Sequence, residues 1–145
     1  MGDTIAILPT YNENENITAV VDGVLDQDER VEVLVVDDDS PDGTALIVQE
    51  RYRDNPRVHL MVRRENRGRG LAGVAGFRWA VDRGYEYIVE MDADGSHPPR
   101  YILSILDALG RTDVAICSRM VPGGGETGRP PYRRWITAAA NMYIR

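Results

Sequence analysis

The sequence predicts an α/β fold in which a mostly parallel sheet is covered by helices on both faces. Short apolar runs rich in Ile and Val alternate with amphipathic stretches along the chain. Such runs are typical of parallel strands that are buried on both faces. Their alternation with helices at this spacing indicates strand–helix–strand units. The chain of 145 residues is long enough for a real core, so we expect a single domain over residues 1–145.

The first half of the chain is expected to form three strands and two helices. Pro9 ends the first apolar run, because proline lacks the N–H group that a central strand needs. Asp42 and Gly43 open the second helix, and Asp42 is expected to be its N-cap. The expected elements are a strand at Thr4–Leu8, a helix at Asn16–Leu25, a strand at Val31–Val36, a helix at Thr44–Tyr52 and a strand at Val58–Val62.

The second half is expected to form two helices and two strands. Pro98 and Pro99 open the last helix, since proline is favoured at a helix start. Two isolated side chains are interpreted as structural: His59, which alternates outward on its strand, and Cys117, which alternates inward. The expected elements are a helix at Leu71–Arg83, a strand at Tyr87–Met91, a helix at Tyr101–Leu109 and a strand at Val114–Cys117.

Composition excludes several classes of protein. A hydrophobic content of 43% and a charged content of 28% are ordinary for a soluble globular protein. No apolar stretch approaches the roughly 18 residues that span a bilayer, and the N-terminus lacks a signal-peptide pattern. One Cys and two His exclude an internal disulfide framework and a Cys/His zinc site. We therefore expect a cytoplasmic protein, and no nucleic-acid partner.

The net charge of −6 is unevenly distributed. Residues 1–110 hold 11 Arg and 21 acidic residues, whereas residues 111–145 hold six Arg and two acidic residues. Every basic residue is Arg, which suits bidentate phosphate contacts but equally reflects genome bias or a salty cytoplasm. In the basic tail, arginines beside Tyr132 and Trp135 suit a phosphate-bearing lipid at a membrane surface. The alternative is a solvated helix that packs its aromatic face on the domain.

Polar clusters follow four of the expected strands. Parallel α/β sheets bind ligands beyond the carboxyl ends of their strands, so these clusters are expected to meet at one edge and form a site. The clusters are Tyr11–Glu13, Asp37–Ser40, Asp92–Asp94 and Ser118–Arg119.

Asp92 and Asp94 are the strongest candidates for metal ligands. Side chains in a strand alternate with period 2, so two carboxylates one residue apart point the same way. They would repel unless a cation lay between them, and Mg²⁺ or Mn²⁺ takes carboxylate oxygens that substrate phosphates complete. Ser96 is a further candidate ligand, or else a helix cap. His97 is not favoured as a general base.

The clusters after the first two strands suit a nucleotide. Tyr11 offers a stacking surface, and Glu13 offers an acceptor for a base edge or a sugar hydroxyl, or else stabilises a helix dipole. Asp37 and Asp38 lie where other nucleotide folds bind ribose. The segment Asn66–Gly70 is either a phosphate cradle or a simple tight turn. It lacks the glycine spacing of a dehydrogenase and the lysine of a P-loop enzyme.

Five motifs in this order resemble those of the dolichyl-phosphate (polyprenyl-phosphate) mannosyltransferases, within the inverting glycosyltransferase family 2. The resemblance extends from residue 5 to residues 140–143. The motifs are Pro9–Glu13, Val36–Thr44, Ala75–Arg78, Met91–Asp94 and Ser118–Gly125.

The resemblance implies a Rossmann-like fold of the GT-A type, with a nucleotide-sugar-binding core over residues 1–110 and a basic acceptor-side segment over residues 111–145. It implies catalytic roles for Asp92, Asp94 and Arg119, with Arg119 on the donor diphosphate or the acceptor phosphate. Metal contacts fall on Asp92, Asp94 and Ser96. Nucleotide-sugar contacts fall on Pro9, Tyr11, Glu13, Val36, Asp38, Ala93, Asp94 and Arg119, and acceptor-phosphate contacts on Arg129, Arg133 and Arg134.

The implied reaction transfers mannose from GDP-mannose to a polyprenyl phosphate, with inversion and release of GDP, at the cytoplasmic face of a membrane. Two alternatives stay open: a UDP-glucose or other donor, and a nucleotide-binding domain without catalysis. Asp39 stands where the family more often has Asn or Gly, and Gly95 replaces a bulky apolar residue. The family continues beyond this point, so we expect a fold incomplete at its C-terminus, with a further segment or a membrane-anchoring partner.

Overall fold

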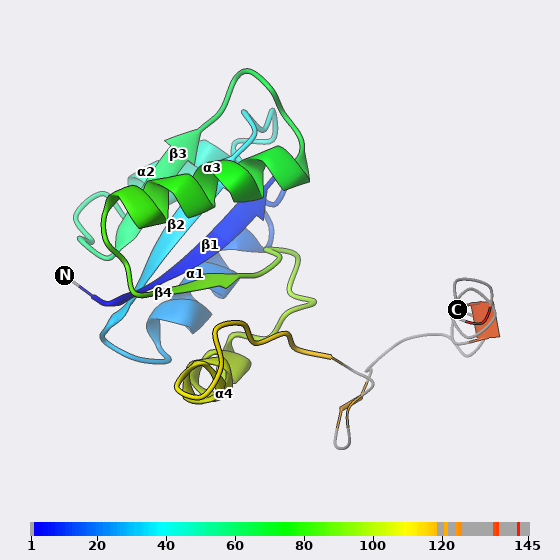
Figure 1. The fold of residues 1–145 in the computed structure, drawn as a ribbon. Helices are drawn as coiled ribbons and strands as arrows, with labels where there is room; N and C mark the ends of the chain where they lie inside the picture. Colours follow the sequence, from blue (N-terminus) through cyan, green and yellow to red (C-terminus); the bar gives the residue numbers. More distant parts are fainter. Residues whose placement is uncertain (1, 119–120, 122–123, 126–134, 137–141, 143–145) are drawn as a thin grey trace. The chain divides into compact units, whose positions relative to one another are not determined.

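The computed structural model describes residues 2–118, 121, 124–125, 135–136 and 142. The chain divides into two compact units, Met1–Asp113 and Val114–Arg145, and each is described by itself. The first unit contains all of the strands and the helices described below (Figure 1). Among the described residues, no helix combines the length and the apolar character needed to cross a bilayer.

The first unit is built on a four-stranded parallel sheet with the order β3-β2-β1-β4. In register, Thr4 pairs with Val31 on one side and with Tyr87 on the other. The chain therefore builds outward from β1 to β2 and β3, and then returns to the opposite side of β1. The strands are β1 (Thr4–Thr10), β2 (Val31–Asp37), β3 (Val58–Val62) and β4 (Tyr87–Glu90).

Helices cover both faces of this sheet, as the sequence predicted. Strand residues of one parity, such as Ala6 and Leu8, share a core with α1, α2 and α4. Residues of the other parity, Ile5 and Ile7, pack under α3, which lies across the opposite face in Figure 1. The helices are α1 (Ile17–Leu25), α2 (Thr44–Arg51), α3 (Arg69–Asp82) and α4 (Ile102–Leu109), with a short 3-10 helix, η1 (Pro99–Tyr101), before α4.

Two local predictions need correction by one or two residues. Pro9 does not end β1, which continues to Thr10. The pairing of β1 with β4 stops at Ile7, so Pro9 sits where β1 has a strand partner on one side and its missing N–H is tolerated. The N-cap of α2 is Gly43, in the left-handed region, because Asp42 instead accepts hydrogen bonds from the N–H and hydroxyl of Thr44.

The predicted fifth strand, at Val114–Cys117, is wrong. Residues 114–118 have neither strand nor helix structure, and the side chains of Val114 and Ile116 are 69% and 86% exposed. A short apolar run alone does not decide between a strand and an irregular segment. Without that alternation Cys117 does not point inward, and it is exposed.

His59 is structural, as predicted, and belongs to a polar cluster around a buried carboxylate on β2. Its Nε2 lies 2.8 Å from Oε2 of Glu32, and the hydroxyl of Tyr85 donates to the same oxygen at 2.6 Å. Burial alone would raise the pKa of Glu32, but these hydrogen bonds outweigh it and lower that pKa. The His59 ring also packs against Trp79, with the ring centres 4.9 Å apart. The cluster anchors the C-terminal part of α3 to β2 and β3.

Small residues let α3 lie unusually close to the sheet. A Cβ added to Gly76 would lie 2.5 Å from Cγ2 of Ile7 and 3.4 Å from Cγ2 of Val36. A Cβ added to Gly73 would lie 2.8 Å from Oε1 of Glu90. This close approach fixes the height of α3 above β1 and β2, and therefore the position of its first residue, Arg69.

We expect Gly76→Ala to lower the free energy of unfolding by about 1–3 kcal/mol, because the added methyl has no space against Ile7. Urea denaturation measures the loss. The matched control is Gly70→Ala in the first turn of the same helix, where a Cβ meets nothing within 4 Å, so stability should stay equal or rise by up to about 1 kcal/mol. Equal midpoints for the two variants would contradict the close packing of α3.

Candidate active site

A cavity of about 310 Å³ opens at the carboxyl ends of β1, β2 and β4. The strand order reverses at β1, and in open parallel sheets ligands bind beside such a reversal. Strand ends and the start of α3 supply its walls. The lining residues are Pro9, Thr10, Tyr11, Glu13, Asp38, Arg69, Ala72, Asp92, Ala93 and Asp94.

The loop after β1 is held in place by side chains of the loop after β2. Three successive backbone N–H groups, from residues 12, 13 and 14, each donate a hydrogen bond at 3.0 Å. Their acceptors are side-chain oxygens of Ser40, Thr44 and Asp42. These bonds fix Tyr11 and Glu13 beside the cavity, and the Tyr11 side chain stays half exposed, as a stacking surface requires.

The three adjacent acids after β2 have three different environments. Asp37 is fully buried and does not line the cavity. Its carboxylate accepts hydrogen bonds from the N–H and hydroxyl of Ser40 and from the hydroxyl of Thr10, so it shapes the loop. Asp39 faces outward and pairs with Arg67 at 2.6 Å. Asp38 alone of the three lines the cavity.

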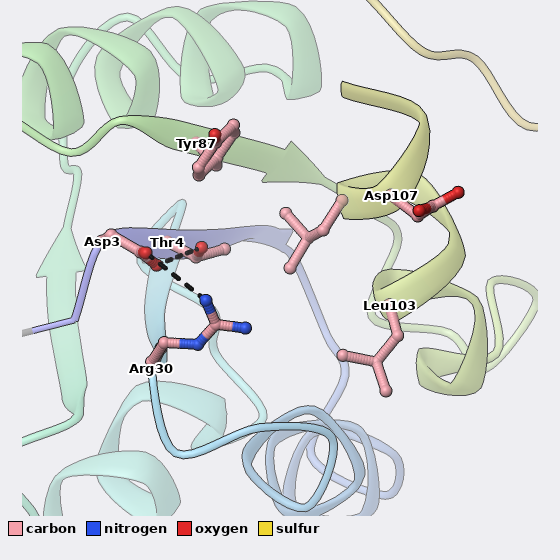
Figure 2. Close-up of a pocket in the computed structure, with 7 residues that line it drawn as sticks. Asp3, Thr4, Arg30, Tyr87, Leu103 and Asp107 are labelled. Carbon is pink, nitrogen blue, oxygen red and sulfur yellow. Dashed lines mark hydrogen bonds and ion pairs between the residues drawn. The ribbon is translucent and has the colours of Figure 1, made fainter. Parts of the chain in front are cut away.

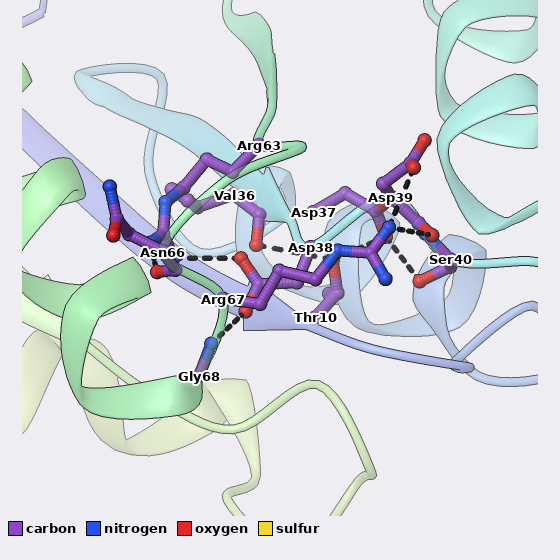
Figure 3. A network of polar contacts seen from close by, with 10 residues as sticks. All are labelled: Thr10, Val36, Asp37, Asp38, Asp39, Ser40, Arg63, Asn66, Arg67 and Gly68. Atoms are coloured by element: carbon purple, nitrogen blue, oxygen red, sulfur yellow. Dashed lines mark hydrogen bonds and ion pairs between the residues drawn. The ribbon is translucent and has the colours of Figure 1, made fainter.

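Asp38 is neutralised by the segment that connects β3 to α3 (Figure 3). Oδ1 accepts from Nη1 of Arg63 at 2.7 Å, and Oδ2 accepts from the N–H of Gly68 at 2.6 Å. The side chains of Asp38 and Arg63 are 6% and 11% exposed. Arg63 also donates to the carbonyl of Asn66. The pair therefore ties the end of β2 to the start of α3.

Asp92 pairs with Arg69, which the sequence placed in the candidate phosphate-cradle segment Asn66–Gly70 without predicting this partner. Nε of Arg69 donates to Oδ1 of Asp92 at 2.8 Å, and Nη2 contacts the same oxygen. The backbone N–H of Asp92 donates to Nδ1 of His97 at 3.0 Å. Through this hydrogen bond His97 acts in this structure as a positioning residue of the loop after β4.

Asp94 is oriented by Ser96. Its Oδ1 accepts from the backbone N–H of Ser96 at 2.9 Å. Hydrogen bonding to the Ser96 side chain and backbone lowers the pKa of Asp94, which keeps this carboxylate ionised and available to a cation. Ser96 itself does not line the cavity. The structure thus places Ser96 as the partner of Asp94.

The site fits a divalent ion only with help from a ligand. Asp92 and Asp94 line one cavity, and their oxygens are the donors that Mg²⁺ and Mn²⁺ prefer. Among the described residues, however, no group of three or more His, Cys, Asp or Glu side chains gathers as a metal cage. Mg²⁺ is often bound by one or two carboxylates together with substrate phosphates. Two carboxylates are therefore enough when a diphosphate completes the coordination.

The cavity brings together most of the predicted nucleotide-sugar residues. Val36 is an exception, because its side chain is buried under α3 and only its backbone reaches this edge. Of the cluster predicted after a fifth strand, Ser118 follows a segment without strand structure and belongs to the second unit. Four predicted residues lie outside the described residues: Arg119, Arg129, Arg133 and Arg134.

A second cavity, of about 260 Å³, lies at the opposite end of the sheet (Figure 2). Asp3, Thr4 and Tyr87 at the starts of β1 and β4 face Leu103 of α4 across it. Among the described residues Arg30 is the one cation that lines it, and its guanidinium is already paired with Asp28 at 3.0 Å and lies 3.8 Å from Asp3. The amino ends of parallel strands are not where such sheets bind ligands, so the candidate site remains the carboxyl edge.

A parallel sheet with a chain reversal beside an acid-lined cavity defines the class of α/β nucleotide-binding domains. Within that class the chain belongs to glycosyl transferase family 2, whose model matches residues 5–144. A solved structure, that of S. aureus TarS, is similar with a TM-score of 0.55 and 32% sequence identity, over 65% of this chain and 17% of that chain. The predicted GT-A-type fold is confirmed.

Several curated relatives carry names from lipid-linked mannose chemistry. The undecaprenyl-phosphate mannosyltransferase of Micrococcus luteus is 43% identical, over 97% of this chain and 58% of that protein. The polyprenol monophosphomannose synthase of Mycolicibacterium smegmatis is 46% identical, over 98% of this chain and 54% of that protein. The dolichol-phosphate mannosyltransferase of Pyrococcus furiosus is 39% identical, over 96% and 39%. The chain thus spans little more than half the length of the first two.

We expect Arg63→Met to lower the free energy of unfolding by about 3 kcal/mol, because it leaves the buried carboxylate of Asp38 without its cation. Arg64→Met is the matched control. That side chain is 83% exposed and lies 3.9 Å from Asp39, so its loss should cost less than about 1 kcal/mol. Chemical denaturation of both variants checks the difference, and similar small losses would show that the Asp38–Arg63 pair does not anchor the edge.

Proposed function

We propose that this chain transfers mannose from GDP-mannose to a polyprenyl phosphate, with inversion at the anomeric carbon and release of GDP. The single observation that carries the proposal is the cavity at the β1 reversal, which gathers Tyr11, Glu13 and Asp38 opposite Asp92 and Asp94. Relatives 43% and 46% identical are named for mannose transfer or synthesis on undecaprenyl phosphate and polyprenol. The arrangement offers a binding surface for a nucleoside on one side of the cavity and for a diphosphate on the other.

The nucleoside half of the donor is assigned to the loops after β1 and β2. The exposed ring of Tyr11 stacks on the base, and the carboxylate of Glu13 accepts hydrogen bonds from a base edge or a ribose hydroxyl. Asp38 is already bound to Arg63 and Gly68. Its remaining acceptor capacity faces the cavity, where a ribose hydroxyl donates to it.

The diphosphate half is assigned to the loop after β4. Asp92 and Asp94 would hold a divalent ion, Mg²⁺ or Mn²⁺, which supplies charge neutralisation for the leaving diphosphate. Ser96 keeps Asp94 ionised and oriented for that task. Arg119 is proposed to contact the donor diphosphate or the acceptor phosphate.

The acceptor supplies its own nucleophile. The second pKa of a phosphate monoester is about 6, so its oxygen is largely anionic at neutral pH and needs no strong base. This oxygen forms a bond to the anomeric carbon while the bond from that carbon to the GDP oxygen breaks, and the electron pair leaves with GDP. His97, whose Nδ1 accepts a backbone N–H, is not required as a base. Catalysis then rests on positioning and electrostatics.

The basic segment 111–145 is proposed to meet the acceptor at the cytoplasmic surface of a membrane. Arg129, Arg133 and Arg134 are assigned to the lipid phosphate, since arginine binds phosphate in a bidentate manner. The side chains of Trp135 and Ile136 are 78% and 63% exposed, which suits insertion at a lipid interface. A membrane-anchoring partner or a further chain segment would assist this contact.

Transfer is tested with GDP-[¹⁴C]mannose and a polyprenyl phosphate in detergent. We expect label to pass into the lipid fraction only with Mg²⁺ or Mn²⁺ present. Asp94→Asn should lower the rate by about 10²–10³-fold, because it removes charge stabilisation at the leaving group. Asp82→Asn, at the exposed far end of α3, is the control and should leave the rate unchanged. Metal-independent transfer, or the absence of any lipid-linked product, would overturn the proposal. GDP binding without product would instead favour a nucleotide-binding domain without catalysis.

The identity of the base is tested by calorimetry with GDP and UDP. Guanine offers an exocyclic amino donor beside its ring N–H, which suits a carboxylate acceptor, so we expect GDP to bind about tenfold more tightly or better. If Glu13 reads the base, Glu13→Gln should reduce this preference, whereas loss of a ribose contact would weaken both ligands equally. Glu15→Gln, at an exposed neighbouring position, is the matched control. Tighter binding of UDP would favour a uridine-based donor.

A further inference from the structure

Arg69 is the cavity residue that the proposed function leaves without a role. It is the first residue of α3, and its guanidinium is the only one among the described arginines that lines the cavity. Arg63 and Arg67, from the same segment, pair with Asp38 and Asp39 and do not line the cavity themselves. The position of Arg69 is fixed by the close packing of α3 on the sheet. The fold therefore holds the guanidinium of Arg69 beside the carboxylates at this edge of the sheet.

The contact of Arg69 with Asp92 uses the carboxylate proposed to hold the metal. Both Nε and Nη2 of Arg69 contact Oδ1 of Asp92. A divalent ion and this guanidinium therefore compete for the same oxygen.

The Arg69–Asp92 pair is well placed to exchange partners. The side chain of Arg69 is 61% exposed and that of Asp92 is 30% exposed. Exposed ion pairs contribute little net free energy, in contrast to the nearly buried Asp38–Arg63 pair. A guanidinium released from Asp92 remains within the cavity, where a diphosphate presents the paired oxygens that arginine binds best.

We propose that Arg69 is a resident counter-cation that is handed from Asp92 to the donor diphosphate when a divalent ion binds. This inference rests on the proposed function for the identity of the diphosphate. In the free site Arg69 neutralises Asp92 and opposes binding of metal alone. When a nucleoside diphosphate arrives with the ion, Arg69 gains a new anionic partner as it loses the old one. Metal and diphosphate binding are thereby coupled, and the coupling acts equally in both directions.

The test is Mn²⁺ binding to the intact chain, followed by the loss of the free-ion EPR signal, with and without GDP. For Arg69→Met we expect Mn²⁺ alone to bind about threefold to fivefold more tightly than to the unsubstituted chain, because the competing, partly exposed ion pair is gone. We expect GDP to bind the Mn²⁺-loaded variant about tenfold more weakly, because the diphosphate loses a bidentate partner. GMP, which has no diphosphate, should bind both forms within about twofold.

Arg67→Met is the matched control, because it removes an equal charge from the same segment but at Asp39, a residue that does not line the cavity. It should leave both affinities unchanged. Thermal melts confirm that each variant is folded, and a merely loosened site would weaken both ligands instead of tightening one. Unchanged or weaker Mn²⁺ binding by Arg69→Met, or an equal gain in Arg67→Met, would overturn the inference.

The two proposals fail separately. Mn²⁺ binding to the free chain needs neither a lipid nor a sugar. If Arg69→Met binds Mn²⁺ more tightly but the chain transfers no mannose, the proposed function is wrong and the role of Arg69 as a counter-cation stands. If the chain transfers mannose normally but its Mn²⁺ affinity does not change in Arg69→Met, only the proposed role of Arg69 is wrong.

Discussion

The compensation of strand-end carboxylates by arginines is the interaction on which the site depends. Acidic side chains gathered at one edge of a parallel sheet repel each other, and a buried carboxylate is costly unless it is paired. One segment, residues 63–69, supplies cations to the ends of both β2 and β4. It thereby joins strands on either side of β1 across the cavity. The pairs are Arg63–Asp38, Arg67–Asp39 and Arg69–Asp92.

Burial separates the structural pair from the exchangeable one. Asp38 and Arg63 are almost excluded from water, so breaking that pair leaves a buried charge unpaired and lowers the free energy of unfolding by several kcal/mol. Asp92 and Arg69 retain access to water, and such a pair is worth roughly 0–1 kcal/mol. The same chemistry therefore fixes the wall of the cavity at β2 and leaves the wall at β4 free to rearrange around a ligand.

The sequence was sufficient to predict the structural features that depend on local sequence patterns. Apolar runs and amphipathic stretches predicted the four strands and four helices of the first unit, and the parallel-sheet rule predicted that Tyr11, Asp38 and Asp92 would share an edge. The arginine pairs were not predicted, because their partners are 23 to 28 residues apart and no motif encodes such a distance. The run Val114–Cys117 shows the opposite error, because its pattern suits a strand but the segment has no strand structure.

The backbone conformation of residue 39 explains how Asp is accommodated where the resemblance leads one to expect Asn or Gly. Asp39 adopts a positive φ of 54°, in the region that Gly and Asn occupy most readily and that Asp also tolerates. Asn or Gly, which the resemblance leads one to expect at that position, would satisfy the same backbone demand. In this chain Asp39 adds a charge, and Arg67 removes it at 2.6 Å. The charge of Asp39 is thus compensated within the same edge of the sheet.

The same balance extends to the proposed ligand. A donor diphosphate is an anion, and it must approach carboxylates that would repel it unless cations lie between them. The Nε–Nη2 edge of Arg69, which contacts Asp92, cannot serve that carboxylate and the diphosphate at the same time. Asp92 and Asp94 would release that edge to the diphosphate if they held a divalent ion. The acidic pair after β4 is therefore best understood together with Arg69: two carboxylates and one mobile cation, arranged so that neither metal nor diphosphate is held strongly without the other.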